Sequence, residues 1–241
     1  MPARRADPRQ RWRIVLALWL GFATGPLAAA AETEASARAV AARYFAAHNA
    51  HHLDDVMALY AENSRFTLSM GRGTVVGTAS LRNLELFDAM AGSVLHPFGA
   101  SFEAQEDGWH MHLAGVLESS SIFRAMGLYI VRTQPIRSTF VIRDGHITAV
   151  IQPELMPACS RTMVHGLDAL TDWLKSSQNP FGDILLHDGR LDLRATNVAE
   201  TIATINAWRA KTGWQPEPAD AAQCAGADFY STVTDFARLR G

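Results

Sequence analysis

The chain lacks the sequence elements of several common classes of enzyme and binding protein. It has no Gly-x-Ser-x-Gly element for an activated serine and no Gly-rich loop that would hold a phosphate. Gly71 and Gly73 are typical of a turn instead. It also lacks a basic stripe, because its Lys and Arg residues are scattered along the sequence. Binding to nucleic acid requires clustered positive charge, so nucleic acid is not an expected partner.

A long hydrophobic run is missing near the N-terminus as well. The apolar segment there covers about residues 14–25, whereas a membrane-spanning helix needs roughly 20 residues. It follows five Arg residues and precedes a run of alanines that ends at Ala31, a pattern typical of a secretory signal peptide. General secretion is favoured over twin-arginine export, because Arg4 and Arg5 are not followed by apolar residues. We expect residues 1–31 to be cleaved and the mature protein to be periplasmic or secreted, with no membrane association afterwards.

Cysteine is scarce, and only Cys159 and Cys224 occur. An exported protein meets an oxidising environment, where an even number of cysteines favours pairing. We therefore expect a Cys159–Cys224 disulfide, with two separate buried thiols as the alternative. Removal of residues 1–31 takes away five Arg and one Asp, which shifts the formal net charge from −2 to about −6.

Hydrophobic periodicity predicts three helices and one strand in the first part of the mature chain. The helices are expected over residues 35–50, 53–60 and 78–90, and the strand over 65–69, followed by a Gly-rich turn. The expected inward faces are Ala37, Val40, Ala41, Tyr44 and His48 on the first helix, Leu53, Val56, Met57 and Tyr60 on the second, and Leu81, Leu84, Phe87 and Met90 on the third.

From about residue 95 the pattern changes to the alternation typical of strands. Asp107-Gly108 and Asp144-Gly145 indicate tight turns between them. Pro135 predicts a bulge, because proline cannot donate a hydrogen bond to a central ladder. The expected strands cover residues 98–106, 108–119, 127–142 and 146–151.

After residue 157 the pattern is helical again. Helices are predicted over residues 160–177 and 197–211, the second with Thr196 as its N-cap. Between them, residues 187–189 indicate a short strand or turn, and residues 215–226 are expected to form an irregular tail.

The segment from Ala41 to Leu81, AARYFAAHNAHHLDDVMALYAENSRFTLSMGRGTVVGTASL, resembles the beginning of the NTF2-like superfamily. That superfamily includes ketosteroid isomerases, SnoaL-type polyketide cyclases, dehydratases and many non-catalytic proteins. The resemblance covers about residues 35–154 and implies an α+β cone, in which a curved, mostly antiparallel sheet wraps around N-terminal helices. We therefore expect an NTF2-like domain over residues 32–156 and a helical C-terminal extension over 157–241.

The resemblance also implies candidate site residues. In ketosteroid isomerases a tyrosine of the first helix and two carboxylic acids act on the substrate. Tyr44 falls on that tyrosine, but the acid positions fall at about Leu68 and Ser138. Neither can act as a general base near neutral pH, so steroid isomerisation is not expected. His48 follows Tyr44 by one turn, and scytalone dehydratase-like members use tyrosine and histidine groups. Tyr44 and His48 are thus the candidate catalytic pair, with structural packing as the alternative for each.

The expected ligand pocket lies between the first helix and the concave face of the sheet. Either Trp109 and Met111 or the alternating His110 and His112 point into it. We favour the first pair, because bulky apolar side chains need burial more than histidines do. The candidate lining comprises Tyr44, His48, Tyr60, Leu68, Trp109, Met111 and Ser138.

Neither a metal nor a cofactor is expected. His48, His51 and His52 have a spacing that metal ligands use, but they fall at a helix end. Glu103 and Glu118 would form a pair with raised pKa values only if neighbouring strands brought them together, and exposed strand carboxylates are the commoner case.

Three functions follow from this pattern. We rank first an exported NTF2-like protein that binds a small, mostly apolar molecule in the cone without catalysis, because the carboxylates of its catalytic relatives are missing. The second is a SnoaL- or dehydratase-type enzyme (an isomerase, cyclase or lyase) that uses Tyr44 and His48. The third is a dimeric scaffold that pairs through the outer face of its sheet.

Overall fold

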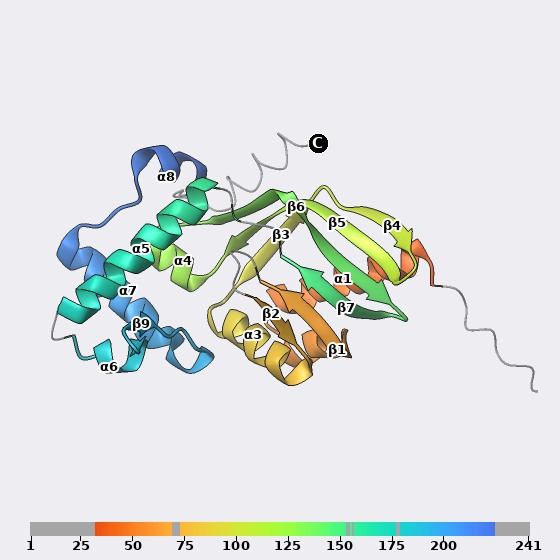
Figure 1. Cartoon of the computed structure of the whole chain (residues 1–241), viewed down its shortest axis with the longest axis horizontal. Coiled ribbons are helices and arrows are strands. Elements are labelled where there is room, and N and C mark those ends of the chain that lie inside the picture. The colour runs from red at the N-terminus through yellow and green to blue at the C-terminus, as the bar shows by residue number, and fades with distance from the viewer. Residues whose placement is uncertain (1–31, 69–72, 153–154, 156, 177–178, 225–241) are drawn as a thin grey trace, which may run out of the picture. The chain divides into compact units, whose positions relative to one another are not determined.

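A curved sheet of seven strands carries helix α1 (Glu34–Asn49) against its concave face (Figure 1). The computed structural model describes residues 32–224 except 69–72, 153–154, 156 and 177–178, and within helices and strands it leaves out the side chains of 130–138, 157 and 221–223. The expected signal peptide, residues 1–31, lies outside the described residues. The described residues belong to one compact unit that starts at Glu32.

Helix α1 confirms the predicted helix and its inward face. The Thr33 hydroxyl accepts a hydrogen bond from the backbone N–H of Ser36, and the Ser36 hydroxyl accepts one from the backbone N–H of Thr33. All of its inward residues except His48 pack in one apolar core with Met111 and Leu113 of the sheet. The buried residues of the helix are Ala37, Val40, Ala41, Tyr44 and His48.

The second helix is shorter than predicted. Helix α2 (Leu53–Met57) ends before Tyr60, which starts strand β1 (Tyr60–Thr67). Tyr60 pairs in parallel register with Ile147, whose N–H donates to the carbonyl of Leu59. This long-range pairing fixes an extended backbone where local apolar spacing alone predicts a helix. Strand β2 (Thr74–Val76) then pairs antiparallel with β1, and α3 (Thr78–Met90) has the predicted bounds.

The strands of the sheet follow the order β2-β1-β7-β6-β5-β3, and β4 also pairs with β5. The predicted strand over residues 98–106 is divided at Gly99, which has a φ of 64°. A Cβ at this position would lie 2.5 Å from that of Ala114, so glycine is required. Helix α4 (Ser121–Met126) is capped by Ser120, and the strand expected from residue 127 begins after it, at Ile130. The bounds are β3 (Val94–Phe98), β4 (Ser101–Gln105), β5 (Gly108–Ser119), β6 (Ile130–Arg143) and β7 (His146–Ile151).

The turn and the bulge expected in the last two strands are both present. Asp144 and Gly145 have φ values of 52° and 75° in the tight turn between β6 and β7. Between β5 and β6 the register shifts, since Leu113 pairs with Ser138 whereas Gly115 pairs with Thr133. The extra residues of β6 include proline 135, as predicted.

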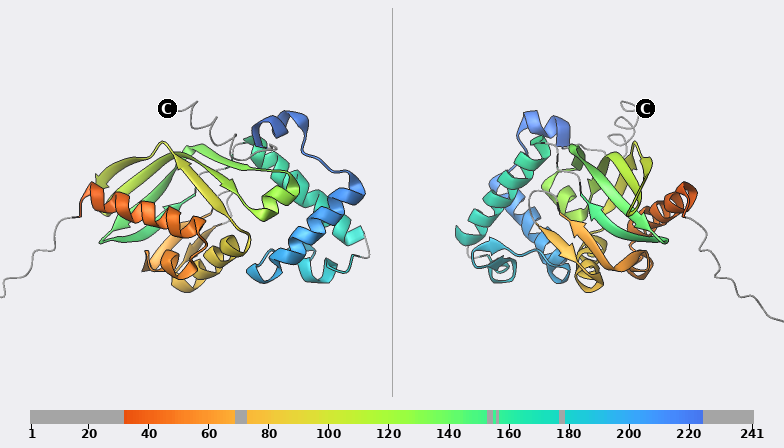
Figure 2. Two further views of the ribbon diagram at one scale, coloured as in Figure 1. Left: turned by 180° about the vertical axis from the view of Figure 1, so that it is seen from behind. Right: turned by 45° about the vertical axis from the view of Figure 1, so that its right-hand side comes forward.

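The C-terminal extension packs beside α4 (Figure 2). Its core joins Met126 of α4 to Leu170 and Trp208. Helix α8 replaces the expected irregular tail, and Asn197 rather than Thr196 precedes α7. The extension and α4 share one core, so packing does not separate the two expected domains at residue 156. The boundary there stays a prediction. The elements are α5 (Pro157–Ser176), α6 (Gly182–Leu185), β8 (Leu186–His187), β9 (Arg190–Leu191), the 3-10 helix η1 (Ala195–Asn197), α7 (Val198–Thr212) and α8 (Pro218–Cys224).

A disulfide joins Cys159 of α5 to Cys224 of α8, as predicted. Both cysteines are buried beside Leu117 and Tyr129. The backbone N–H of Tyr129 donates to the carbonyl of Cys224. The disulfide therefore joins the first helix of the extension, α5, to its last described helix, α8, next to the sheet.

We predict that the double variant Cys159→Ser/Cys224→Ser unfolds at a lower urea concentration than the wild type. The bridge spans 65 residues, and in the loop-entropy model closing a loop of this length is worth about 4 kcal/mol. Urea unfolding followed by circular dichroism measures the difference. Reduced wild-type protein should behave like the variant, and an unchanged midpoint in both would contradict the prediction.

A second prediction concerns pH. Arg161 of α5 donates two hydrogen bonds to Asp220 of α8, and this pairing lowers the pKa of the Asp220 carboxyl. A lowered folded-state pKa means that the pair stabilises the protein above the unfolded pKa of about 3.9, and that this contribution is lost as the pH falls through the folded pKa. Asp220→Asn should therefore lower the free energy of unfolding at pH 7.

The difference between Asp220→Asn and the wild type should shrink as the pH falls below about 4. Urea titrations at a series of pH values measure it. Asp183→Asn, which changes an exposed carboxylate on α6, is the matched control and should show no such trend. A difference for Asp220→Asn that stays constant down to the lowest pH would rule out the ion pair as its cause.

Candidate functional site

The buried face of α3 differs from the predicted one. Leu81 is fully buried, but the next buried position is Glu85, with 3% exposure, whereas Met90 is 58% exposed. Sequence reasoning missed Glu85, because carboxylates are rarely buried unless they are paired. Its i, i+4 spacing from Leu81 is the signal that points to it.

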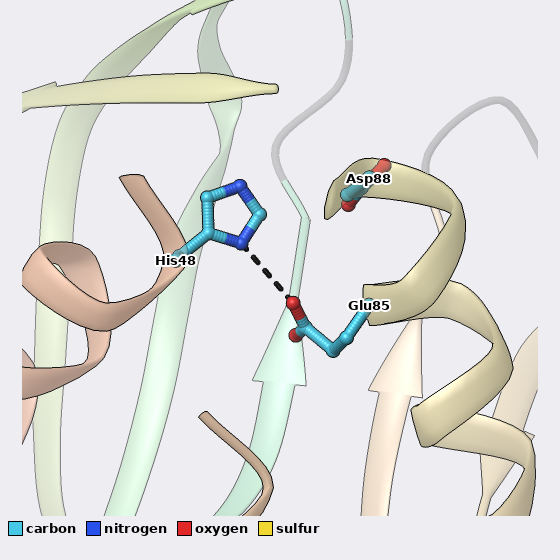
Figure 3. Close-up of side chains that lie close together, drawn as sticks. All are labelled: His48, Glu85 and Asp88. Atoms are coloured by element: carbon cyan, nitrogen blue, oxygen red, sulfur yellow. Dashed lines mark hydrogen bonds and ion pairs between the residues drawn. The ribbon is translucent and has the colours of Figure 1, made fainter. Parts of the chain in front are cut away.

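Glu85 is buried because other buried side chains hold its carboxylate. Tyr44 and Tyr60 donate hydrogen bonds to its Oε1, at 3.1 Å and 2.6 Å. His48 Nδ1 lies 3.1 Å from its Oε2, the contact drawn as a dashed line in Figure 3. The other ring nitrogen of His48 lies 3.4 Å from the Ser93 hydroxyl. We call Tyr44, His48, Tyr60 and Glu85 the Glu85 network, and it satisfies the polar groups that its burial removes from water.

Burial and charge set the protonation of this network. Burial raises the pKa of Tyr44 and of Tyr60, and the charge of Glu85 raises both further. Both phenols are therefore neutral hydrogen-bond donors at neutral pH. Burial by itself lowers the pKa of His48, but the hydrogen bond and charge of Glu85 outweigh burial, so the net shift is upward.

Glu85 overturns the expectation of an interior without acidic groups. A carboxylate lies directly beside Tyr44, but it comes from α3 and not from the sheet. Leu68, at one expected acid position, is half-buried just after β1. Ser138, at the other, pairs with Leu113 through its backbone, and its side chain lies outside the described residues.

Little space remains around the network. The cavity that touches His48 and Glu85 has a volume of about 10 Å³, room for one water molecule at most. Trp109 and Met111 point into the apolar core, as favoured from the sequence, and they help to fill the cone together with Tyr44. The hollow expected between α1 and the sheet is therefore packed with side chains in the described part of the chain.

The large cleft lies instead between α3 and the C-terminal extension, and its volume is about 1480 Å³. One wall comes from α3, α4 and the nearby strand ends, and the other from α5, β9 and the residues that lead into η1. Of the expected pocket residues whose side chains the structure describes, only Leu68 lines it. Asp88, one turn after Glu85, lines the cleft and also lies close to His48 (Figure 3).

The other histidines of the expected cluster do not join the network. His51 Nε2 lies 3.0 Å from the backbone carbonyl of Ser93. His52 is exposed beside Asp55. The three-histidine spacing at the end of α1 therefore does not produce a common site.

The histidines of the sheet lie apart from the network as well. His110 and His112 are on the face opposite to Met111, and His110 contacts Asp107. Glu103 pairs in register with His110, whereas Glu118 lies near the other end of β5. The two glutamates therefore do not meet.

We predict that Tyr60→Phe lowers the free energy of unfolding by about 2 kcal/mol, because it leaves a buried carboxylate with one hydrogen bond fewer. Glu85→Gln should destabilise the protein for the same reason. In the double variant the two losses should not add, since each removes the same interaction. Urea unfolding of the four proteins gives the coupling energy, and strictly additive losses would argue against the network.

No family model and no curated protein matches the chain. Among solved structures, it is similar to the epoxide hydrolase/cyclase-like enzyme SalBIII, described for pyran ring formation in the polyether salinomycin, with 17% identity and a TM-score of 0.43 over 52% of this chain and 93% of that one. An NTF2-like protein from Burkholderia xenovorans shows 14% identity and a TM-score of 0.38 over 50% and 89% of the two chains. For an LEH-like epoxide hydrolase from M. tuberculosis the values are 14% and 0.38, over 51% and 79%.

These likenesses concern the fold and carry no information about activity. No helix among the described residues is long and apolar enough to cross a membrane. The order of elements and the curved sheet around α1 agree with the architecture expected from the sequence, an α+β cone with a helical C-terminal extension.

Proposed function

We propose that the protein binds a small, mostly apolar molecule, without catalysis, in the cleft between α3 and the C-terminal extension. The main observation in support of this proposal is the size of the cleft. Small-molecule sites typically have volumes of about 300 to 1,000 Å³, and this cleft, at about 1480 Å³, has room for a ligand of that size.

Apolar side chains line both walls. Leu84 and Phe87 of α3 lie on one wall and Leu167 of α5 on the other. Each square ångström of apolar ligand surface that these walls cover is worth about 25 cal/mol. Charged side chains also line the cleft, among them Asp88 on the side of the cone and Arg190 on the side of the extension. An apolar molecule with one or two polar groups matches this lining.

The placement of Tyr44 and His48 supports binding rather than chemistry. Neither side chain lines the cleft. The Tyr44 hydroxyl donates to Glu85, and both ring nitrogens of His48 have partners. A general acid or base must come within about 3 Å of the reacting group, directly or through one water. The network supports a structural role for both residues.

A SnoaL- or dehydratase-type enzyme is the second candidate, and Asp88 favours it. Asp88 lines the cleft, and its carboxylate and a ring nitrogen of His48 lie within 4.8 Å of each other. A carboxylate next to an imidazole can pass a proton between a bound substrate and His48. In that case His48→Ala should abolish turnover of a hydroxylated or carbonyl-bearing substrate, and unchanged turnover would exclude the alternative.

Export belongs to the same proposal. The disulfide supports it, because disulfides persist mainly in oxidising compartments. Mass spectrometry of the protein from its own host tests whether the mature chain begins near Glu32. Pairing of two copies through the outer face of the sheet remains the third candidate, and sedimentation analysis tests it separately.

We predict that Leu86→Arg weakens binding of the neutral apolar dye Nile red by at least about tenfold, because the charge occupies the cleft. Met90→Arg is the matched control, since Met90 lies on the same helix, is exposed and does not line the cleft. Fluorescence titration measures both affinities. Equal affinity in the two variants would place the dye elsewhere, and native mass spectrometry of the wild type then shows whether a natural ligand is retained.

A further inference from the structure

His48, Glu85 and Asp88 bring three metal-binding groups together (Figure 3). Asp88 also lines the cleft. His48 comes from the last turn of α1, and the two acids come from successive turns of α3. One ligand atom from each residue lies within 4.8 Å of the other two. Two ligands bonded to one ion at about 2.1 Å lie roughly 3 to 3.5 Å apart. The 3.1 Å between His48 Nδ1 and Glu85 Oε2 already falls in that range.

The remaining atoms of His48 and Glu85 are held by other side chains. In the metal-free protein Nδ1 of His48 donates a hydrogen bond to Glu85, and a bound ion would replace that proton. Ser93 Oγ lies 3.4 Å from Nε2 and can accept a hydrogen bond from the proton that then stays on Nε2. Tyr44 and Tyr60 both donate to Glu85 Oε1, so Oε2, which contacts His48, is the oxygen that would bind the ion. Partners of this kind orient metal-binding side chains and raise the affinity of the site.

We propose that His48, Glu85 and Asp88 bind one divalent transition-metal ion, for which Zn²⁺ is the best match. An imidazole nitrogen and two carboxylate oxygens belong to the ligands that Zn²⁺ prefers. The two carboxylates neutralise the charge of the ion. Because Glu85 is buried and Asp88 half-buried, a cation between them also relieves the repulsion of like charges at close range.

Because Asp88 lines the cleft, the free coordination position of the proposed site would face the cleft. Three protein ligands leave a fourth position for water or for an oxygen of a bound molecule. A cleft ligand with a carbonyl, carboxylate or hydroxyl oxygen would thus complete the coordination. This last step rests on the proposed function of the cleft, whereas the metal site itself does not.

Calorimetric titration of the chelator-treated protein with Zn²⁺ tests the site, together with the visible absorption of bound Co²⁺. We expect one tight site in the wild type, weakened at least about tenfold in Asp88→Asn and in Glu85→Gln. The Co²⁺ absorption bands should disappear in the same variants. His52→Ala and Asp107→Asn are the controls, because each breaks a histidine–aspartate pair that lies outside the proposed site.

Equal Zn²⁺ affinity in the wild type and Asp88→Asn, or loss of the tight site in either control, would overturn the proposal. Asp88→Asn decides the matter even if Glu85→Gln does not fold, because Asp88 is not a member of the Glu85 network. Dye binding to the metal-free protein tests the cleft independently, so failure of the metal site and failure of the cleft give different results.

Discussion

The burial of one carboxylate, Glu85, fixes how the first half of the structure is assembled. Its hydrogen-bonding partners come from α1 and β1, while Glu85 itself belongs to α3, so three elements meet at one point. An ionised carboxylate away from water is costly unless it is well paired. Helix α3 must therefore be rotated about its axis so that Glu85 faces its partners on α1 and β1. That rotation directs Phe87 and Asp88 to the cleft and Met90 to solvent. The cleft wall is thus set by a residue that does not line it.

The sequence predicts α1 well and α3 only in part, and the difference has a physical cause. On α1 the inward positions follow the helical period and are mostly apolar, so periodicity alone identifies them. On α3 the inward face contains a charge, and its donors Tyr44 and Tyr60 lie 41 and 25 residues away. Local pattern cannot reveal such partners. Tyr60 itself fits a helix locally, and only its pairing with Ile147 makes it a strand residue.

The position of the binding space was harder still to predict. A resemblance to cone-shaped proteins implies a hollow between α1 and the sheet, but Trp109, Met111 and Tyr44 are large enough to help fill it. The actual cleft needs the C-terminal extension for its second wall, and the resemblance does not reach that part of the chain. Leu68 belongs to both the expected pocket and the cleft, because it follows directly after β1 and lines the cleft there.

The disulfide gives the second wall a property that packing alone does not. Cys159 and Cys224 enclose α5 to α8 in a covalent ring, and the cleft residues of α5, β9 and η1 all lie within it. One cut by a protease anywhere in the ring leaves both fragments attached, each anchored beside Tyr129. Such a nicked molecule migrates as a single chain in a non-reducing gel, and it separates into two pieces only when a thiol reagent opens the bridge.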